Sequence, residues 1–159
     1  MKEYSEAEAL NKAAAYCTLC ERCISEVAGK LTSWGINYTQ QRRIIERLID
    51  EKFIDEKRYC TAVVNDKLRF NHWGRIKIAA KLKEKRIATH EISEALSAID
   101  EEEYSATLHK LLINKQKELK KESNEQMTKQ KILRFAISRG FEYPLIIKQL
   151  KFDPDEMDI

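Results

Sequence analysis

The chain has 159 residues, of which 43% are apolar and 35% are charged, and its formal net charge is +3. Four glycines and two prolines are too few for the many tight turns of a β-rich fold, so the composition favours long helices. No run of eighteen apolar residues occurs, and the first six residues carry acids without an apolar core. We therefore expect no membrane span, no secretory signal and a cytoplasmic location.

The first third of the chain contains signals for three helices. Ser5 and Glu8 have the spacing of a capping box at the start of an alanine-rich helix. A second helix is expected over residues 24–33, with Gly35 as its left-handed C-terminal cap. Thr39 is expected to cap the third helix.

The middle of the chain predicts three more helices. Asp55 is expected to cap a long fourth helix that reaches Leu68, and residues 71–74 are expected to form a turn. A fifth helix follows this turn, and Thr89 is expected to cap the sixth.

The last part of the chain predicts a third set of three helices. Asp100 and Glu103 are expected to form the capping box that opens the seventh helix. The eighth is expected to end at Gly140, and the ninth to begin near Pro144. Residues 152–159 are rich in acids and are expected to be a disordered tail.

Short sequence elements repeat at intervals of roughly 45–50 residues. Tyr16-Cys17-Thr18 recurs as Tyr59-Cys60-Thr61, and helix-stop signals align at Trp34-Gly35-Ile36, Lys85-Arg86-Ile87 and Arg139-Gly140-Phe141. We predict an all-α fold of three tandem three-helix repeats in an elongated, gently curved array. The predicted boundaries are 1–54, 55–99 and 100–151, followed by the tail 152–159. The alternative is that three amphipathic helix triples resemble one another by chance.

Positive charge is concentrated in the middle of the chain. Residues 57–90 contain ten lysines or arginines and only two acids, whereas the segments on either side are mildly acidic. A localised basic surface favours a polyanion or an acidic protein face as the binding partner.

The motifs together resemble the RecX family of regulatory proteins. The matching pieces are Lys30-Leu31-x-x-Trp34-Gly35-Ile36, Phe53-Ile54-Asp55-Glu56-Lys57-Arg58-Tyr59, Trp73-Gly74-Arg75-Ile76, Lys81-Leu82, Lys131-Ile132-x-Arg134-Phe135 and Arg139-Gly140-Phe141. The resemblance runs from about residue 9 to 150 and implies the same three tandem three-helix repeats. The chain departs from the family at Arg86, where glycine is usual.

The fifth helix contains the main candidate binding residues. Lys77, Lys81 and Lys85 are expected to form a basic ridge on the face opposite Ile78 and Leu82. The ridge is supported by Lys67, Arg69 and Arg75. These cations could follow phosphates or meet carboxylates on a protein, and the alternative is an ordinary solvated helix face. Trp73, at the entrance of this helix, is expected to plug the core under the turn, although it could instead stack on a base.

Four cysteines raise the question of a metal site. Cys17, Cys20, Cys23 and Cys60 could supply four thiolates to zinc or an iron–sulfur cluster. The residues between them continue a helical pattern without a proline to fold a ligand loop, so we expect reduced thiols packed between helices, and neither metal nor cofactor. His72, His90 and His109 lie far apart, and no catalytic motif occurs, so we expect no enzymatic activity.

The resemblance implies a partner and a function. It implies a monomeric protein that binds RecA recombinase filaments on single-stranded DNA and modulates them, either by inhibition or by support. We expect inhibition, with the basic ridge facing the nucleoprotein. A helical module that binds nucleic acid directly is the alternative, and a redox or metal sensor acting through the cysteines is a more distant one.

Overall fold

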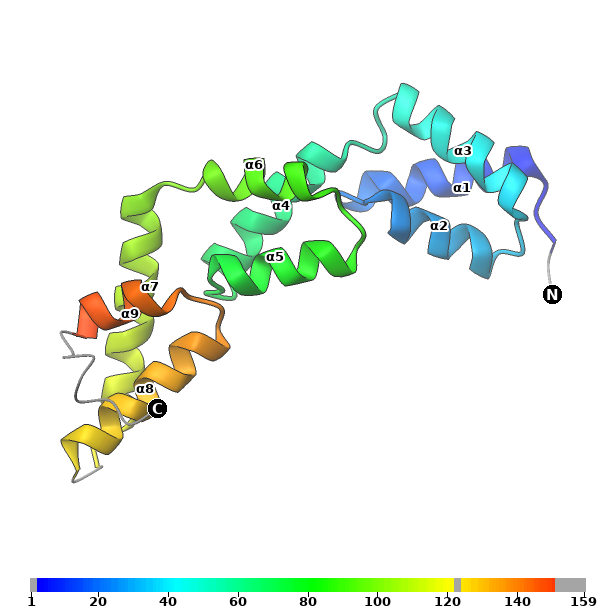
Figure 1. The fold of residues 1–159 in the computed structure, drawn as a ribbon. Coiled ribbons are helices and arrows are strands. Elements are labelled where there is room, and N and C mark those ends of the chain that lie inside the picture. The colour runs from blue at the N-terminus through cyan, green and yellow to red at the C-terminus, as the bar shows by residue number, and fades with distance from the viewer. Residues whose placement is uncertain (1–2, 122–123, 151–159) are drawn as a thin grey trace. The chain divides into compact units, whose positions relative to one another are not determined.

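The computed structural model describes residues 3–121 and 124–150, which contain nine α-helices and no strand (Figure 1). The helices are α1 (Glu6–Leu19), α2 (Ile24–Ser33), α3 (Tyr38–Asp50), α4 (Glu56–Arg69), α5 (Arg75–Glu84), α6 (Thr89–Ser97), α7 (Glu101–Glu118), α8 (Glu125–Ser138) and α9 (Tyr143–Leu150). This confirms the predicted all-α fold class. The predicted tail, residues 152–159, lies outside the described residues.

The described chain forms two compact units. The first contains residues 3–62 and 82–93, and the second contains residues 63–81, 94–121 and 124–150. In the first unit α1, α2 and α3 pack against one another, and in the second α7, α8 and α9 do the same. The boundaries of the three repeats and the shape of the array remain predictions.

The core of the first unit is built around small residues on α1. Ala9 and Ala13 have no exposed surface, because they lie where α2 and α3 approach α1. The other core members are Cys17, Val27, Leu31, Ile36, Ile44, Leu48 and Ile54. The core of the second unit includes Tyr104, Leu108, Ile132, Ala136, Phe141 and Ile146. These residues recur at the three- and four-residue spacings from which the helices are predicted.

Three helices that occupy the same place in the proposed repeats end in the same way. The N–H of Ile36 donates to the carbonyl of Leu31 after α2, and Gly35 takes a φ of +77°. Equivalent bonds join Ile87 to Leu82 after α5 and Phe141 to Ala136 after α8. The residue before each of these donors is left-handed, which is the geometry of a Schellman motif.

Arg86 is the departure from glycine in this series. It holds a φ of +62° at the position that aligns with Gly35 and Gly140, although it carries a β-carbon. A non-glycine residue in this region costs on the order of 1 kcal/mol. The helix end after α5 is therefore formed at a small cost in stability.

The predicted N-terminal caps are correct in two cases. The Ser5 hydroxyl accepts from the Glu8 N–H at 3.1 Å, and the Glu8 carboxylate accepts from the Ser5 N–H. The Asp55 carboxylate accepts from the Arg58 N–H at 3.0 Å, as expected for the start of α4.

Three predicted caps are wrong. Asn37, not Thr39, caps α3 by accepting from the Gln40 N–H at 2.9 Å, so the helix begins one residue before Thr39. Thr89 is itself the first residue of α6. Asp100 is at the N-cap of α7, but its side chain accepts no capping hydrogen bond, and the Glu103 side chain, expected to complete the box, pairs with Arg69.

Three of the four cysteines are buried thiols. Cys17, Cys23 and Cys60 are buried, whereas Cys20 is exposed at the end of α1. Burial raises the pKa of Cys60 to about 11, with further contributions from nearby carboxylates. Burial also raises the pKa of Cys17 and Cys23. No group of three or more metal-binding side chains is found among residues 3–121 and 124–150.

We expect the native protein to show a single fast thiol toward an aromatic disulfide reagent at pH 8. Only Cys20 is accessible, and the thiolate fraction of Cys60 is about a hundredfold smaller than that of a thiol with the ordinary pKa of 9.0. Stopped-flow absorbance should resolve one rapid equivalent, with the other three released after denaturation. Two or more rapid equivalents would contradict the packing of the three buried thiols.

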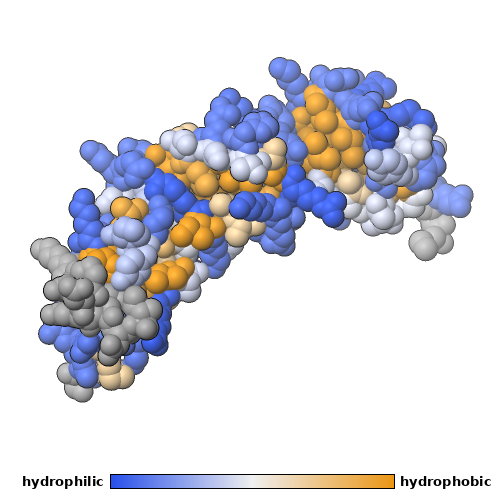
Figure 2. All heavy atoms as spheres, viewed as in Figure 1, coloured by the Kyte–Doolittle hydropathy of each residue, from blue (hydrophilic) through white to orange (hydrophobic). Residues whose placement is uncertain are grey.

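In the described part of the chain, no helix combines the length and the apolar character needed to cross a bilayer. Hydrophilic residues cover much of the face shown in Figure 2, with apolar patches between them.

Candidate nucleic-acid interface

Trp73 contacts two lysines in the second unit. It occupies the turn between α4 and α5 and is half-buried. The Lys67 Nζ lies 4.7 Å from the centroid of its ring and the Lys77 Nζ lies 4.4 Å from it. The indole therefore has two cations close to its ring, which is neither a plain core plug nor a bare stacking platform.

The turn that carries Trp73 is held against the turn between α8 and α9. The Gly74 N–H donates to the Arg139 carbonyl at 2.8 Å, and the Ile76 N–H donates to the Gly140 carbonyl at 3.0 Å. A β-carbon on Gly74 would lie 2.4 Å from the Gly140 carbonyl oxygen. The two backbones can approach this closely only because both residues are glycine.

A second aromatic ring with cations belongs to α8, the helix that precedes the turn with Gly140. The Arg139 guanidinium lies 5.1 Å from the Phe135 ring centroid, and the Lys115 Nζ lies 4.5 Å from it. The same guanidinium donates to the Asn71 carbonyl, in the turn that carries Trp73. We call the group Lys67, Trp73, Lys77, Lys115, Phe135 and Arg139 the aromatic–cation surface.

Most cations of the aromatic–cation surface are not neutralised. Lys115 pairs with Glu118 at 3.3 Å. Among residues 3–121 and 124–150, no carboxylate lies within ion-pair distance of Lys67, Lys77 or Arg139. Three positive charges on two half-exposed rings are suited to phosphates and bases, which offer negative charge and flat faces.

Two arginines predicted as supporting contacts are already in ion pairs. Arg69 donates to Glu103 at 2.9 Å, and this hydrogen bond lowers the pKa of the Glu103 carboxyl. Arg75 pairs with Glu142 at 2.8 Å and also with Glu101. Both are therefore less available to a partner than the two lysines on Trp73.

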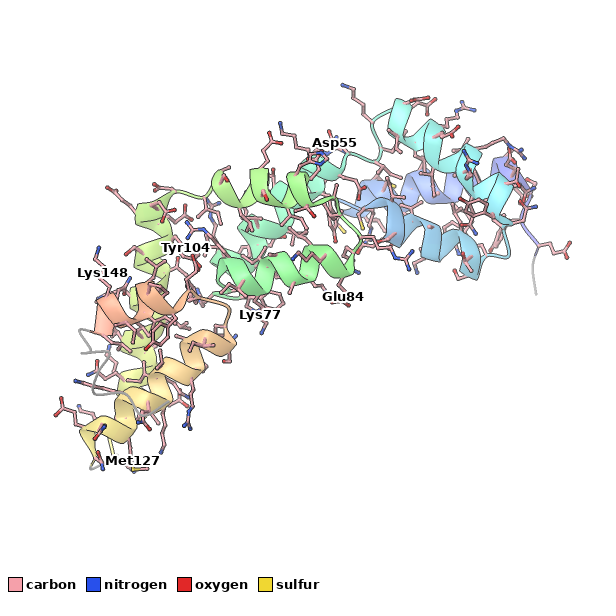
Figure 3. All side chains as sticks on the ribbon, in the orientation of Figure 1. Asp55, Lys77, Glu84, Tyr104, Met127 and Lys148 are labelled. Carbon is pink, nitrogen blue, oxygen red and sulfur yellow. The ribbon has the colours of Figure 1, made fainter. Side chains whose placement is uncertain are left out.

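Arg75 is part of a polar network that joins α5, α7 and the turn before α9 in the second unit. The Tyr104 hydroxyl accepts from the Arg75 backbone N–H at 2.9 Å and donates to Glu142. The Arg75 guanidinium lies 3.9 Å from the Tyr104 ring centroid. Burial is the largest single effect on the pKa of Arg75 and lowers it, but the hydrogen bond to Glu142 and the charges of Glu142, Tyr104 and Glu101 together keep this pKa above its ordinary value. The network fixes the start of α5, which carries Lys77 (Figure 3).

The three lysines of the predicted ridge differ in their surroundings. Lys77 lies on Trp73, and Lys81 is half-buried without a carboxylate in ion-pair distance among the described residues. Lys85 belongs to the first unit, where it pairs with Glu26 at 3.4 Å and its carbonyl accepts from the Ser25 hydroxyl. Lys85 therefore contacts α2 and is less available to a partner.

The predicted face of the ridge is wrong. The three lysines are half-buried, and the exposed positions of α5 are Ile76, Ala80, Lys83 and Glu84. At 100° per residue, Lys81 and Lys85 fall within about 60° of Ile78, so they flank the buried side. The exposed face opposite Ile78 therefore contains both apolar and charged side chains.

Large apolar side chains are exposed near the same turns. Phe70 precedes the Trp73 turn and is 79% exposed, and Ile76 begins α5 and is 58% exposed. Ile137, whose carbonyl accepts from the Gly140 N–H, is 46% exposed. Apolar and cationic groups therefore occur together in this part of the second unit.

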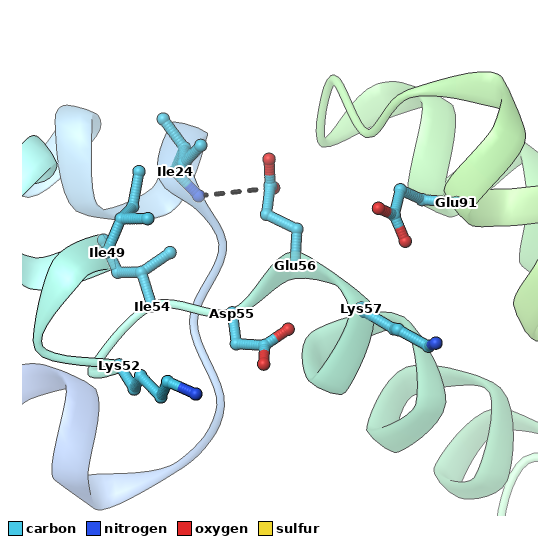
Figure 4. A pocket seen from close by; sticks show the side chains of 8 residues that line it. All are labelled: Ile24, Ile49, Lys52, Ile54, Asp55, Glu56, Lys57 and Glu91. Carbon is cyan, nitrogen blue, oxygen red and sulfur yellow. Dashed lines mark hydrogen bonds between the residues drawn. The ribbon is translucent and has the colours of Figure 1, made fainter.

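A pocket in the first unit has the opposite charge. It is lined by Ile24, Ile49, Lys52, Ile54, Asp55, Glu56, Lys57 and Glu91 (Figure 4). The Glu56 carboxylate accepts from the Ile24 N–H, and burial followed by the charge of Glu91 raises the pKa of Glu56. Acidic side chains here disfavour a polyanion, so the candidate interface is the aromatic–cation surface.

Half of the aromatic–cation surface, namely Lys115, Phe135 and Arg139, was not predicted from the sequence. Phe135 and Arg139 are four residues apart, so their contact on one helix end could have been predicted from spacing alone. Lys115 reaches Phe135 only through the packing of α7 against α8, which no local pattern reveals.

The chain is similar to proteins named RecX. Residues 55–96 match the family model described as "RecX, second three-helix domain". The regulatory protein RecX of Lactobacillus johnsonii is 28% identical over 160 residues, covering 99% of this chain and 59% of that protein. The regulatory protein RecX of Clostridium perfringens (strain SM101 / Type A) is 34% identical over 119 residues, covering 74% of this chain and 55% of that protein.

A solved structure has the same fold. The crystal structure of RecX from Lactobacillus salivarius superposes with a TM-score of 0.83 at 23% identity, covering 92% of this chain and 94% of that one. The chain spans only about 55 to 59% of the length of the two curated relatives above.

Proposed function

Because this chain belongs to the RecX family, we propose that it is a regulatory protein that binds RecA recombinase filaments on single-stranded DNA and lowers their activity. The curated relatives are named for regulation and not for a catalysed reaction. The observation that carries the proposal is the set of unneutralised cations on Trp73 and Phe135 in the second unit.

A RecA filament on DNA offers this surface the groups that it lacks. Phosphates and acidic protein side chains would neutralise Lys67, Lys77 and Arg139, and the release of counterions favours such contacts. The neighbouring apolar groups would bury surface against the protein part of the filament. The protein acts as a monomer in the cytoplasm and performs no reaction.

Reversing the two charges on Trp73 should weaken regulation. We expect the Lys67→Glu/Lys77→Glu variant to need at least about ten times more protein to inhibit RecA-dependent ATP hydrolysis on single-stranded DNA, which corresponds to about 1.4 kcal/mol of lost binding. Co-sedimentation with RecA–DNA filaments should show the same loss.

The matched control is Lys83→Glu/Lys110→Glu. Both residues are exposed lysines, on α5 and α7, and neither touches the aromatic–cation surface. This control changes the net charge equally and should inhibit like the unmodified protein. Equal inhibition by the folded Lys67→Glu/Lys77→Glu variant would remove the surface from the mechanism, and stimulation of hydrolysis would refute inhibition.

A second candidate function is direct binding to single-stranded nucleic acid, because aromatic rings beside cations are the common means of holding unpaired bases. It predicts affinity for DNA without RecA, with a salt dependence of about −0.7 in log–log slope for each contacted phosphate. DNA alone, used as the control in the co-sedimentation experiment, separates the two functions.

A further inference from the structure

We propose that the acidic segment 151–159 of this chain binds the aromatic–cation surface and competes with its polyanionic partner. The intramolecular contact stands independently, and only its consequence for regulation rests on the proposed function.

The charges of the two sides are complementary. Segment 151–159 contains four acids, Asp153, Asp155, Glu156 and Asp158, against the single cation Lys151. The aromatic–cation surface offers three cations that no described carboxylate neutralises. Each side therefore carries the charge that the other lacks.

The apolar groups are complementary as well. Segment 151–159 places Phe152, Met157 and Ile159 among its acids. Beside the surface, Phe70, Ile76 and Ile137 are exposed to 79%, 58% and 46%. Docking of an acidic segment with apolar side chains would cover these groups, whereas single-stranded DNA would supply no aliphatic partner for the isoleucines.

The chain is long enough to reach. Segment 151–159 follows α9 directly, and α9 lies in the same unit as the surface. The Gln149 side chain donates to Ser105, and the hydroxyl of the adjacent Tyr104 accepts from the Arg75 N–H, two residues after Trp73. Each of these two contacts spans one side chain. The distance from the end of α9 to Trp73 is therefore within the roughly 30 Å that nine extended residues span.

The consequence is a tethered competitor. If the segment occupies the surface for about 90% of the time, the apparent affinity for any other polyanion falls about tenfold. A filament, which presents many phosphates and carboxylates at once, would displace the segment more readily than an isolated strand would.

Carbodiimide cross-linking of the full chain at low ionic strength tests the contact. We expect mass spectrometry to find an amide between Lys67 or Lys77 and an acid of segment 151–159. In an equal mixture of unlabelled and ¹⁵N-labelled protein, this amide should join peptides of one isotope only. Links only to control lysines such as Lys110 or Lys117, links between copies, or no link would overturn the proposal.

A binding measurement tests the competition. The probe is a fluorescent thirty-residue oligothymidylate, and the variant is Asp153→Asn/Asp155→Asn/Glu156→Gln/Asp158→Asn. We expect it to bind about ten times more tightly than the unmodified chain at low salt, and to lose this gain when Lys67→Glu/Lys77→Glu is added. Equal binding, or no binding by either protein, would overturn the competition. If the unmodified protein gives the cross-link but has no effect on RecA, only the proposed function is refuted.

Discussion

Gly140→Ala is expected to lower the free energy of unfolding by about 3 kcal/mol. Gly140 has a φ of +93°, and a β-carbon there would lie 2.3 Å from the Lys77 Cβ and 2.5 Å from the Lys77 backbone nitrogen. Both atoms belong to Lys77, in the first turn of α5, and neither can move away by a side-chain rotation. The substitution therefore adds backbone strain to a steric clash.

Urea unfolding followed by circular dichroism measures this loss, and Gly29→Ala is its control. Gly29 lies inside α2 with nothing within 4 Å of the new β-carbon, so alanine there should stabilise the helix by up to about 1 kcal/mol. A Gly140→Ala variant as stable as the unmodified protein would mean that the turns at Gly74 and Gly140 do not meet.

Arg75→Met is expected to cost about 2 kcal/mol of stability. Methionine keeps an apolar chain over Tyr104 but removes the cation, which leaves the Glu142 carboxylate with the Tyr104 hydroxyl alone. The Arg75 side chain is only 19% exposed and that of Glu142 28%, so water replaces the lost partner incompletely. Partial exposure makes the loss smaller than for a fully buried pair.

The control for this prediction is Arg69→Met. It removes an arginine of the same unit whose partner is Glu103, but this pair lies in solvent, with 58% and 38% of the side chains exposed. In thermal unfolding, we expect the midpoint temperature of the Arg69→Met variant to equal that of the unmodified protein. Equal losses for the two variants would show that the network around Tyr104 contributes nothing beyond a surface ion pair.

Most of the helical fold could be predicted because its signals are local. Ser5 and Glu8 are close in sequence, Gly35 and Gly140 mark helix ends, and apolar residues recur at helical spacing. The errors at Thr39 and Asp100 have different causes. Two capping side chains compete at the start of α3, and a distant arginine engages the acid expected to complete the cap of α7.

The candidate surface could be predicted only in part. Lys67 and Lys77 were identified because positive charge is dense in the middle of the chain. Their joint contact with Trp73 depends on how α4 and α5 meet at the turn. The roles of Arg75 and Lys85 could not be predicted, because Glu142 and Glu26 lie 67 and 59 residues away in sequence.

The exposure of Cys20 among four thiols provides a natural attachment point for a spectroscopic label. A fluorophore or spin label can be placed on the first unit of the unmodified chain, far in sequence from the lysines proposed to bind. Adding one engineered cysteine in the second unit would create a pair of labels. Their separation could then be followed as the protein joins a filament, without first replacing a native cysteine.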